Sequence, residues 1–263
     1  MKSNQNKTYK ILLVDDNFMN AFYAKTVLEK SNYTVSVANN GFEALENLKL
    51  HTFDLVLMDV QMPLMDGYET SSKIRIELRK SVRDLPIVML TGNDESMNDL
   101  EPGIQYVNDI LNKPYTPKDL IDKVSKFLND GNGSKLDSKK VDKSIKYSNT
   151  SPINLDYLSE VCDNDPKFIR EMMQSFIKNT PNDFRHLTTL IDNNNWIDAA
   201  EYAHKLKSAV RFVGATTLID LLNSVEKESL VQKPNTSLNL LMNDAEILLQ
   251  EIINHLSDEI KKL

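Results

Sequence analysis

The chain has 263 residues, which suits two ordinary domains, and its 41% hydrophobic content is compatible with globular cores. The formal net charge of −7 argues against nucleic acid as the main partner, because phosphate backbones are bound by an excess of basic side chains. The single cysteine, Cys162, excludes an intramolecular disulfide. In the absence of an apolar stretch of about 18 residues or an apolar signal core, we expect a cytoplasmic protein with no direct membrane insertion.

Residues 1–128 alternate short apolar runs with amphipathic segments. The apolar runs predict strands at residues 11–14, 35–38, 55–58, 87–90 and 106–111. The amphipathic segments predict helices at residues 19–31, 41–50, 67–79, 96–101 and 117–127. Because fully apolar strands that alternate with helices indicate a parallel sheet covered on both faces, we expect a doubly wound α/β domain. Its site should lie at the carboxyl ends of the strands.

Residues 129–151 lose the apolar periodicity and are rich in Gly, Asn, Ser and Lys, which is typical of a flexible linker. A flexible chain of about twenty residues spans roughly 25 Å. A linker of this reach predicts that two sites on the chain could meet, with an effective concentration in roughly the millimolar range.

Residues 152–263 have a helical pattern throughout. Asp165-Pro166 and Thr180-Pro181 both have the form of a capping residue followed by a proline in the first turn of a helix. After a short leading helix marked by Leu155, the predicted helices are 166–179, 181–193, 197–213, 216–230 and 237–263. This set predicts an all-α domain packed as a four-helix bundle with a flanking helix.

Polar side chains are expected where the strands of the α/β domain end. Asp15 and Asp16 follow the first strand and Asp59 follows the third, so these carboxylates should converge at one edge of the sheet. Like charges this close destabilise one another unless a cation joins them, and Mg²⁺ is the expected cofactor. Thr91 ends the fourth strand with a hydroxyl, and Lys113 follows the fifth with a positive charge. Such groups suit phosphoryl transfer, which depends mainly on positioning and charge neutralisation.

Four segments of this domain carry a resemblance to a known family. They are Leu12-Leu-Val-Asp-Asp-Asn17, Leu57-Met-Asp-Val-Gln-Met-Pro-Leu-Met-Asp-Gly67, Met89-Leu-Thr-Gly92 and Asn112-Lys-Pro114. In order and spacing they resemble the signatures of two-component receiver (response-regulator) domains, and Met-Asp-Val-Gln-Met-Pro is typical of receivers attached to hybrid histidine kinases. The resemblance implies a flavodoxin-like fold with a five-stranded parallel sheet.

By this resemblance, Asp59 is the aspartate that accepts a phosphoryl group. Asp16 would bind Mg²⁺ directly and Asp15 largely through water. The Gln61 backbone carbonyl would join Asp59 in completing the protein ligands. The residues that the resemblance implies for contact with the phosphoryl oxygens are Thr91 and Lys113.

One position departs from the receiver pattern. Receivers commonly carry Tyr or Phe three residues before the lysine, where this chain has Ile110. Pro102-Gly103 also interrupts the segment expected to form the fourth helix, and proline breaks helix interiors. The resemblance therefore leaves two readings of Ile110 open, an altered switch or an ordinary core side chain.

A second candidate site lies in the helix predicted over residues 197–213. His204, Lys207, Ser208 and Arg211 share a face that we expect to point toward solvent. An exposed imidazole flanked by cations suits an acceptor of a dianionic group. The apolar stripe on the other face, expected to meet a core, consists of Ala199, Ala203, Leu206, Val210 and Val213.

The segment Ala203-His-Lys-Leu-Lys-Ser-Ala-Val-Arg-Phe-Val-Gly-Ala215 resembles the histidine-phosphotransfer (HPt) signature. The resemblance implies that His204 is phosphorylated on its distal ring nitrogen. Lys207, with Arg211 as a further candidate, would hold the phosphoryl oxygens. This family usually has glycine where this chain has Ser208, so we expect the docking of a receiver to be slowed or tuned.

Together the two resemblances, as in the C-terminal part of hybrid sensor histidine kinases, predict a two-component phosphorelay protein. A sensor histidine kinase would phosphorylate Asp59 or His204, and the group would pass between them or to a downstream receiver or HPt protein. No phosphate-cradling glycine loop is present, so we expect a phosphotransfer protein without an ATP-binding kinase domain in this chain. Two alternatives stay open: a phosphatase-like sink that drains a partner receiver, and a phosphorylation-switched binding module whose bundle only docks partners.

Overall fold

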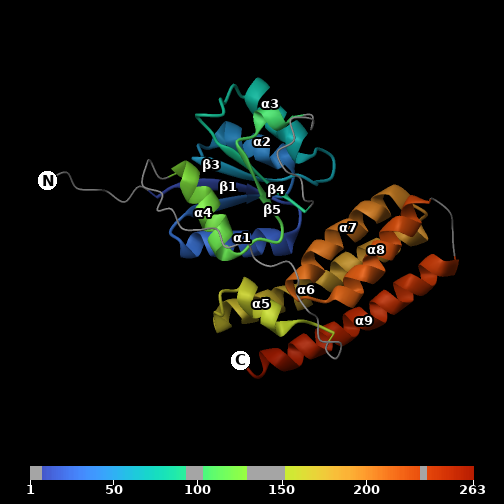
Figure 1. Cartoon of the computed structure of the whole chain (residues 1–263). Helices are drawn as coiled ribbons and strands as arrows, with labels where there is room; N and C mark the ends of the chain where they lie inside the picture. The colour runs from blue at the N-terminus through green and yellow to red at the C-terminus, as the bar shows by residue number, and fades with distance from the viewer. Residues whose placement is uncertain (1–7, 93–102, 129–151, 232–235) are drawn as a thin grey trace. The chain divides into compact units, whose positions relative to one another are not determined.

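The structure is a computed structural model that describes residues 8–92, 103–128, 152–231 and 236–263 (Figure 1). The chain divides into two compact units, Met1–Asp137 and Ser138–Leu263. The division falls inside residues 129–151, for which the sequence predicts a linker, and that segment lies outside the described residues.

The first unit contains a parallel sheet with the strand order β2-β1-β3-β4-β5. The strands are β1 (Lys10–Val14), β2 (Thr34–Ala38), β3 (Leu55–Asp59), β4 (Ile87–Thr91) and β5 (Asp109–Asn112). This is the doubly wound, flavodoxin-like order, in which the chain reverses its direction of winding between β1 and β3. The predicted fold class is thus confirmed for this unit.

Helices cover both faces of this sheet. Figure 1 shows α1 (Phe18–Lys30) with α4 (Pro117–Leu128) on one side, and α2 (Gly41–Leu50) with α3 (Gly67–Ile76) on the other. Strands covered on both faces must be apolar on both faces, and every residue of β3 and β4 is buried. The uninterrupted apolar runs of the sequence follow from this double coverage. The helix predicted at residues 96–101 lies outside the described residues.

Two predicted boundaries in this unit are wrong by several residues. The fifth strand was expected at residues 106–111, but Ile104–Tyr106 form a 3₁₀ helix and β5 covers Asp109–Asn112. The third helix was expected to reach residue 79, but it ends at Ile76, and Arg79 has a positive φ of 53°. A residue with positive φ cannot continue a right-handed helix, which explains the early end.

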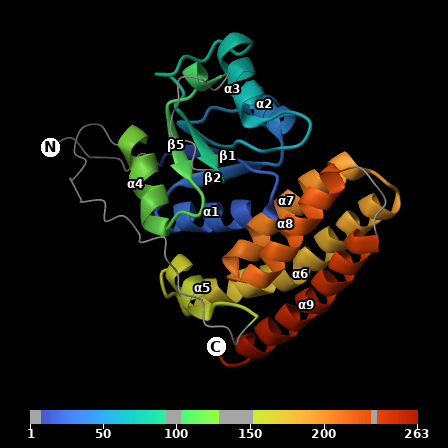
Figure 2. The same ribbon diagram turned by 45° about the vertical axis from the view of Figure 1, so that its right-hand side comes forward.

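The described residues of the second unit form helices joined by short turns, with no strand among them (Figure 2). The short helix α5 (Leu155–Val161) precedes α6 (Pro166–Asp192), α7 (Trp196–Phe212), α8 (Thr216–Leu230) and α9 (Thr236–Ile260). Each long helix packs against two others, in the cyclic order α6, α7, α8, α9. The predicted four-helix bundle with a flanking helix is confirmed.

The prediction of separate helices at residues 166–179 and 181–193 is wrong. The helix α6 runs without a break from Pro166 to Asp192 and contains Pro181 in its interior. Asp165 does cap the helix, since its side chain accepts the backbone N–H of Lys167 at 2.9 Å. Thr180 is buried instead of capping a new helix. The two similar dipeptides therefore occupy different positions, one at a helix start and one inside a helix.

Candidate functional site

The acidic site lies at the carboxyl end of the sheet, where the paired strands β1 and β3 end. Asp15 and Asp16 directly follow β1, and Asp59 is the last residue of β3. One carboxylate oxygen of each residue lies within 4.8 Å of the other two. The expected convergence of these carboxylates is confirmed, because neighbouring parallel strands end at the same edge of a sheet.

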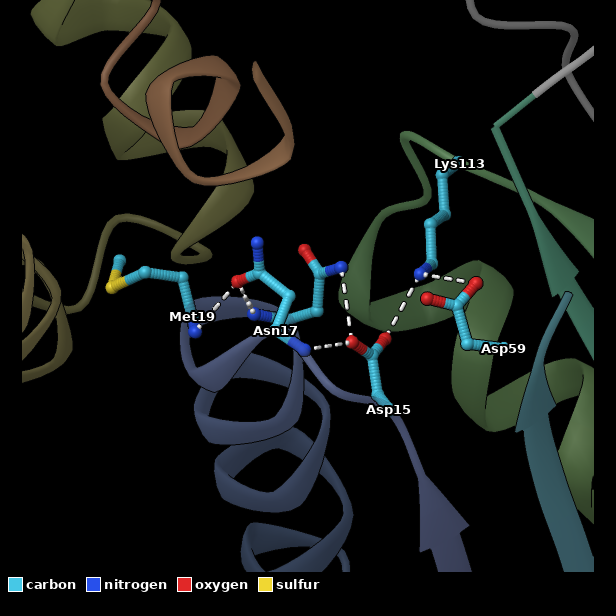
Figure 3. A network of polar contacts seen from close by, with 6 residues as sticks. Asp15, Asn17, Met19, Asp59 and Lys113 are labelled. Atoms are coloured by element: carbon cyan, nitrogen blue, oxygen red, sulfur yellow. Dashed lines mark hydrogen bonds and ion pairs between the residues drawn. The ribbon is translucent and has the colours of Figure 1, made fainter. Parts of the chain in front are cut away.

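Asp15 is held by the first turn of α1. Its Oδ1 accepts the backbone N–H of Asn17 at 2.9 Å (Figure 3). The same oxygen accepts the side-chain amide of Asn20 at 3.3 Å. Asn17 also caps α1, since its own Oδ1 accepts the backbone N–H of Met19 at 2.9 Å. Sequence reasoning assigned no role to Asn17 or Asn20. Asn17 had a usable signal, because an asparagine before an amphipathic segment is a typical helix cap.

Lys113 joins two of the carboxylates. Its ammonium lies 2.9 Å from Asp15 Oδ2 and 3.0 Å from Asp59 Oδ1 (Figure 3). Burial alone would lower the pKa of Lys113, but the two carboxylates raise it above its usual value, so the ammonium stays charged. Tyr23 of α1 supports the segment that follows Lys113, because its hydroxyl donates to the backbone carbonyl of Tyr115 at 3.1 Å.

Asp59 has an unusual acidity for an aspartate. Burial, with the neighbouring negative charge of Asp15, raises the pKa of Asp59 from 3.8 to about 7, although Lys113 acts in the opposite direction. The ionised form of Asp59 is therefore destabilised unless more positive charge lies nearby. The three carboxylates offer oxygen donors, which are the ligands of hard divalent cations, so this donor set fits Mg²⁺.

The other predicted members of the acidic site lie close to Asp59 in the chain or in the sheet. Thr91 is the buried last residue of β4, and its backbone carbonyl accepts the backbone N–H of Lys113 at 2.6 Å. Gln61 is exposed in the loop after β3, two residues beyond Asp59. Ile110 of β5 is partly buried and packs against the apolar core.

The second candidate site lies where α7 and α8 pack together. The side chain of His204 is 35% exposed, and its Nδ1 lies 3.0 Å from Oε1 of Glu226 on α8. Lys207, one turn after His204, donates to Oε2 of the same carboxylate and to Oδ1 of Asn223 at 2.9 Å. Glu226 therefore contacts both the imidazole and the ammonium, with one oxygen for each.

The expected placement of Lys207 on a solvent-facing surface is wrong. Lys207 is buried, because the face that it shares with His204 meets α8. Ser208 and Arg211 on this face are partly buried. Helical spacing correctly grouped these residues, but it could not reveal that a second helix covers part of the group.

Glu226 and Asn223 were missed by sequence reasoning. They lie 22 and 16 residues from the His204 and Lys207 side chains that they contact, on another helix. Burial alone would raise the pKa of Glu226, but hydrogen bonds from Lys207 and His204 lower it below its usual value. Glu226 is thus a carboxylate at neutral pH, and no local motif marks it.

The predicted apolar stripe of α7 is confirmed, since Ala199, Ala203, Leu206, Val210 and Val213 are all buried. Gly214 follows the helix with a positive φ of 64°, as a terminating glycine does. Among the described residues, no helix combines the length and the apolar character needed to cross a membrane.

Comparison with known proteins finds two families in succession along the chain. Residues 11–125 match the response regulator receiver domain, and residues 171–259 match the Hpt domain. Hybrid signal transduction histidine kinase B of Dictyostelium discoideum is 42% identical over 134 residues, which are 47% of this chain and 7% of that protein. Autoinducer 2 sensor kinase/phosphatase LuxQ of Vibrio cholerae is 39% identical over 106 residues, which are 38% of this chain and 12% of that protein.

Among solved structures, the chemotaxis response regulator CheY4 of Vibrio cholerae is 29% identical, with a TM-score of 0.42. The match covers 46% of this chain and 99% of that one. The chain spans only a small part of the two hybrid or sensor kinases named above. The two matched segments correspond to the α/β unit and the helical unit, in the order that the motifs around Asp59 and His204 predict. The chain therefore belongs to the two-component signalling proteins, as a response regulator receiver domain followed by an Hpt domain.

Proposed function

We propose that this chain is a phosphorelay protein that carries a phosphoryl group on Asp59 and on His204 in turn. One observation supports the proposal most directly. The same chain holds a buried aspartate beside a lysine and two further carboxylates, and a partly exposed histidine whose Nδ1 is held by a glutamate. The aspartate would carry the phosphoryl group as an acyl phosphate, and the histidine would carry it as a phosphoimidazole. The chain thus has both acceptors of an aspartate–histidine transfer.

At the receiver site, a carboxylate oxygen of Asp59 would attack the phosphorus, and the bond from phosphorus to the donor atom would break. Lys113 would stabilise the developing charge on the phosphoryl oxygens, since its ammonium already lies 3.0 Å from Asp59. The Thr91 hydroxyl is proposed as a further donor to these oxygens. Positioning and charge neutralisation of this kind account for most of the rate in phosphoryl transfer.

Mg²⁺ bound here would neutralise negative charge on the carboxylates and on the phosphoryl oxygens. Asp16, Asp59 and the Gln61 backbone carbonyl are the proposed direct ligands. Both carboxylate oxygens of Asp15 already accept hydrogen bonds, from Asn17, Asn20 and Lys113, which favours a water-mediated role for Asp15.

At the HPt site, Nε2 of His204 is the proposed nucleophile. If the Nδ1–H group donates a hydrogen bond to Glu226, the lone pair resides on Nε2, which is the tautomer needed for attack. The phosphorus–oxygen bond to Asp59 would break as the phosphorus–nitrogen bond to His204 forms, and the carboxylate would leave. The reverse step returns the electron pair to Nε2.

Phosphate labelling of four proteins tests the proposal: the wild type, Asp59→Asn, His204→Gln and the double variant. Each is incubated with candidate sensor kinases, ATP and Mg²⁺. Phosphohistidine survives base and is lost in acid, whereas an acyl phosphate is lost in base, so the two treatments locate the group. We expect base-stable label to require His204 and base-labile label to require Asp59. Label retained by the double variant would refute the assignment.

Mixing the two single variants tests whether the transfer occurs within one chain. The wild-type transfer should be independent of protein concentration if the step is intramolecular, whereas transfer between the variants must depend on it. A wild-type rate that rises in proportion to concentration would leave only the intermolecular step.

The two alternatives are distinguished by rates and by signalling. In a phosphatase-like sink, transfer from a receiver to His204 must be faster than transfer from His204 to another acceptor. The phosphoryl group on His204 must then be lost by hydrolysis. A binding module requires that His204→Gln leave all signalling unchanged. The proposed partners are a sensor histidine kinase and a downstream receiver or HPt protein. A cytoplasmic location is proposed because the single cysteine suits a reducing compartment.

A further inference from the structure

Glu226 joins the two functional side chains of the HPt site into one small network. Its Oε1 lies 3.0 Å from His204 Nδ1, and its Oε2 accepts from the ammonium of Lys207. Lys207 has only 9% of its side chain exposed, and its second partner is Asn223. The ammonium therefore points toward α8, and its charge is balanced by one carboxylate.

The charges of this network change when His204 is phosphorylated. With a neutral imidazole, Lys207 and Glu226 sum to zero. A phosphoryl group on Nε2 adds nearly two negative charges beside them. Two anions, the phosphoryl group and Glu226, would then compete for the ammonium of Lys207. Because charge-assisted hydrogen bonds are among the strongest in proteins, the carboxylate that already holds Lys207 limits what the ammonium can give to the phosphoryl oxygens.

We propose that Glu226 shortens the lifetime of the phosphoryl group on His204 by retaining Lys207. This inference rests on the proposed function of His204. In this arrangement Glu226 is a positioning residue that acts through Lys207. It keeps the phosphoimidazole poorly compensated and ready to lose its phosphoryl group to a receiver aspartate or to water. In either step the phosphorus–nitrogen bond breaks, its electron pair returns to Nε2, and an oxygen of the acceptor forms the new bond to phosphorus.

The variant Glu226→Gln separates the two contacts of this side chain. A glutamine oxygen can still accept from His204 Nδ1, so the tautomer is kept, but the amide nitrogen cannot accept from Lys207. Lys207 would then be available to the phosphoryl oxygens. Glu201→Gln is the matched control, because it removes the same charge from an exposed residue of α7 one turn before His204.

The experiment uses the full chain with Asp59→Asn, so that no phosphoryl group can leave to its own receiver domain. Labelled phosphoramidate phosphorylates His204 with loss of ammonia, and the decay of base-stable label gives the lifetime. We expect Glu226→Gln to lengthen this lifetime about fivefold and Glu201→Gln to leave it within about twofold. Transfer to the receiver of added His204→Gln protein should slow in parallel.

A double-mutant cycle decides whether Glu226 acts through Lys207. In the Lys207→Met background, Glu226→Gln should no longer lengthen the lifetime. The inference is wrong if Glu226→Gln still lengthens the lifetime in that background, or if it leaves the lifetime unchanged when Lys207 is intact. Far-ultraviolet circular dichroism and the ¹⁵N shifts of His204 verify folding and the Nδ1–H tautomer in each variant. Failure of His204 to take label at all would instead refute the proposed function.

Discussion

At the scale of single residues, the burial of Asp59 has a cost that depends on pH. The pKa of Asp59 is raised from 3.8 in an ordinary environment to about 7 in the fold. Between these two pH values the folded receiver domain holds a proton that the unfolded chain has released. The free energy of unfolding should therefore fall as the pH rises from about 4 through about 7.

We predict that Asp59→Asn stabilises the receiver domain at pH 8 without Mg²⁺, because asparagine has no charge to bury. Because the pKa of Asp59 is raised from 3.8 to about 7, the gain should be about 4 kcal/mol at pH 8 and should vanish below about pH 4. Urea unfolding across this pH range measures it. Asp122→Asn is the control, because it removes the same charge at an exposed helical position outside the acidic site. A constant difference between wild type and Asp59→Asn at all pH values would contradict the raised pKa.

Alanine substitutions at two glycines near the acidic site should have different effects, one lowering the stability and one leaving it unchanged. A Cβ at Gly67 would lie 2.2 Å from the backbone oxygen of Asp59, whereas a Cβ at Gly92 would meet no atom of the described residues within 4 Å. Gly67→Ala must therefore displace the backbone at Asp59, and we expect it to destabilise the domain by about 2 kcal/mol or more. Gly92→Ala should change the stability by less than about 0.5 kcal/mol. Equal urea midpoints for the two variants would be inconsistent with this packing.

Residue-scale prediction from sequence succeeded where the chain order itself carries the geometry. Asp15 and Asp59 end neighbouring parallel strands, so the sequence alone could bring them together. The prediction of an exposed Lys207 failed, because the periodicity of a single helix shows which residues share a face but not which other element covers that face. Glu226 had no signal at all, since a glutamate on a polar helix face looks the same with or without a partner.

At the scale of elements, α6 contains a proline that ought to weaken it. Proline removes one backbone hydrogen bond and its ring crowds the preceding turn. The helix continues because its buried face is continuous across this point. That face includes Met172, Phe176, Thr180, Phe184, Leu187 and Ile191. Packing along the whole length thus outweighs the local cost. The spacing of these apolar residues is visible in the sequence, whereas the dipeptide Thr180-Pro181 taken alone wrongly predicts a helix start.

A pair of proline variants measures this cost. Pro181→Ala should stabilise the Hpt domain by about 1–3 kcal/mol, because alanine restores the interior hydrogen bond. Pro166→Ala, at the first position of the same helix, should have an effect near zero, since no intrahelical bond is missing there. Thermal unfolding of the Hpt domain compares the two. A loss of stability in Pro181→Ala would show that the proline ring itself is needed in the packing.

At the scale of the whole molecule, the chain consists of two compact units with separate cores. The three carboxylates of the proposed Mg²⁺ site, Asp15, Asp16 and Asp59, all belong to the first unit. We predict two thermal transitions, of which only the receiver transition moves with Mg²⁺. At about 100 times the dissociation constant, the stabilisation should be about 2.7 kcal/mol.

The Hpt transition is the internal control of this experiment, and Asp16→Asn should abolish most of the receiver shift. Equal shifts of both transitions would mean that Mg²⁺ acts through general ionic strength and not through the acidic site. The order of the two domains was predictable from the sequence. Apolar strand runs alternate with amphipathic helices in the first domain, the second has a helical pattern throughout, and each carries its own motif. The segment of residues 129–151 carries no such pattern, so nothing in its sequence orients one domain against the other.

The short turn between α7 and α8 has a consequence for how this Hpt domain can evolve. Only Val213, Gly214 and Ala215 separate the helices that carry His204 and Glu226. The added Cβ of any other residue at Gly214 would lie 2.6 Å from Asn154, and its φ is positive. A single inserted residue at the start of α8 would rotate Glu226 by about 100° around the helix and carry it away from the imidazole. Substitutions on the surface of these helices should therefore accumulate freely over generations, while insertions and deletions in this turn should be eliminated.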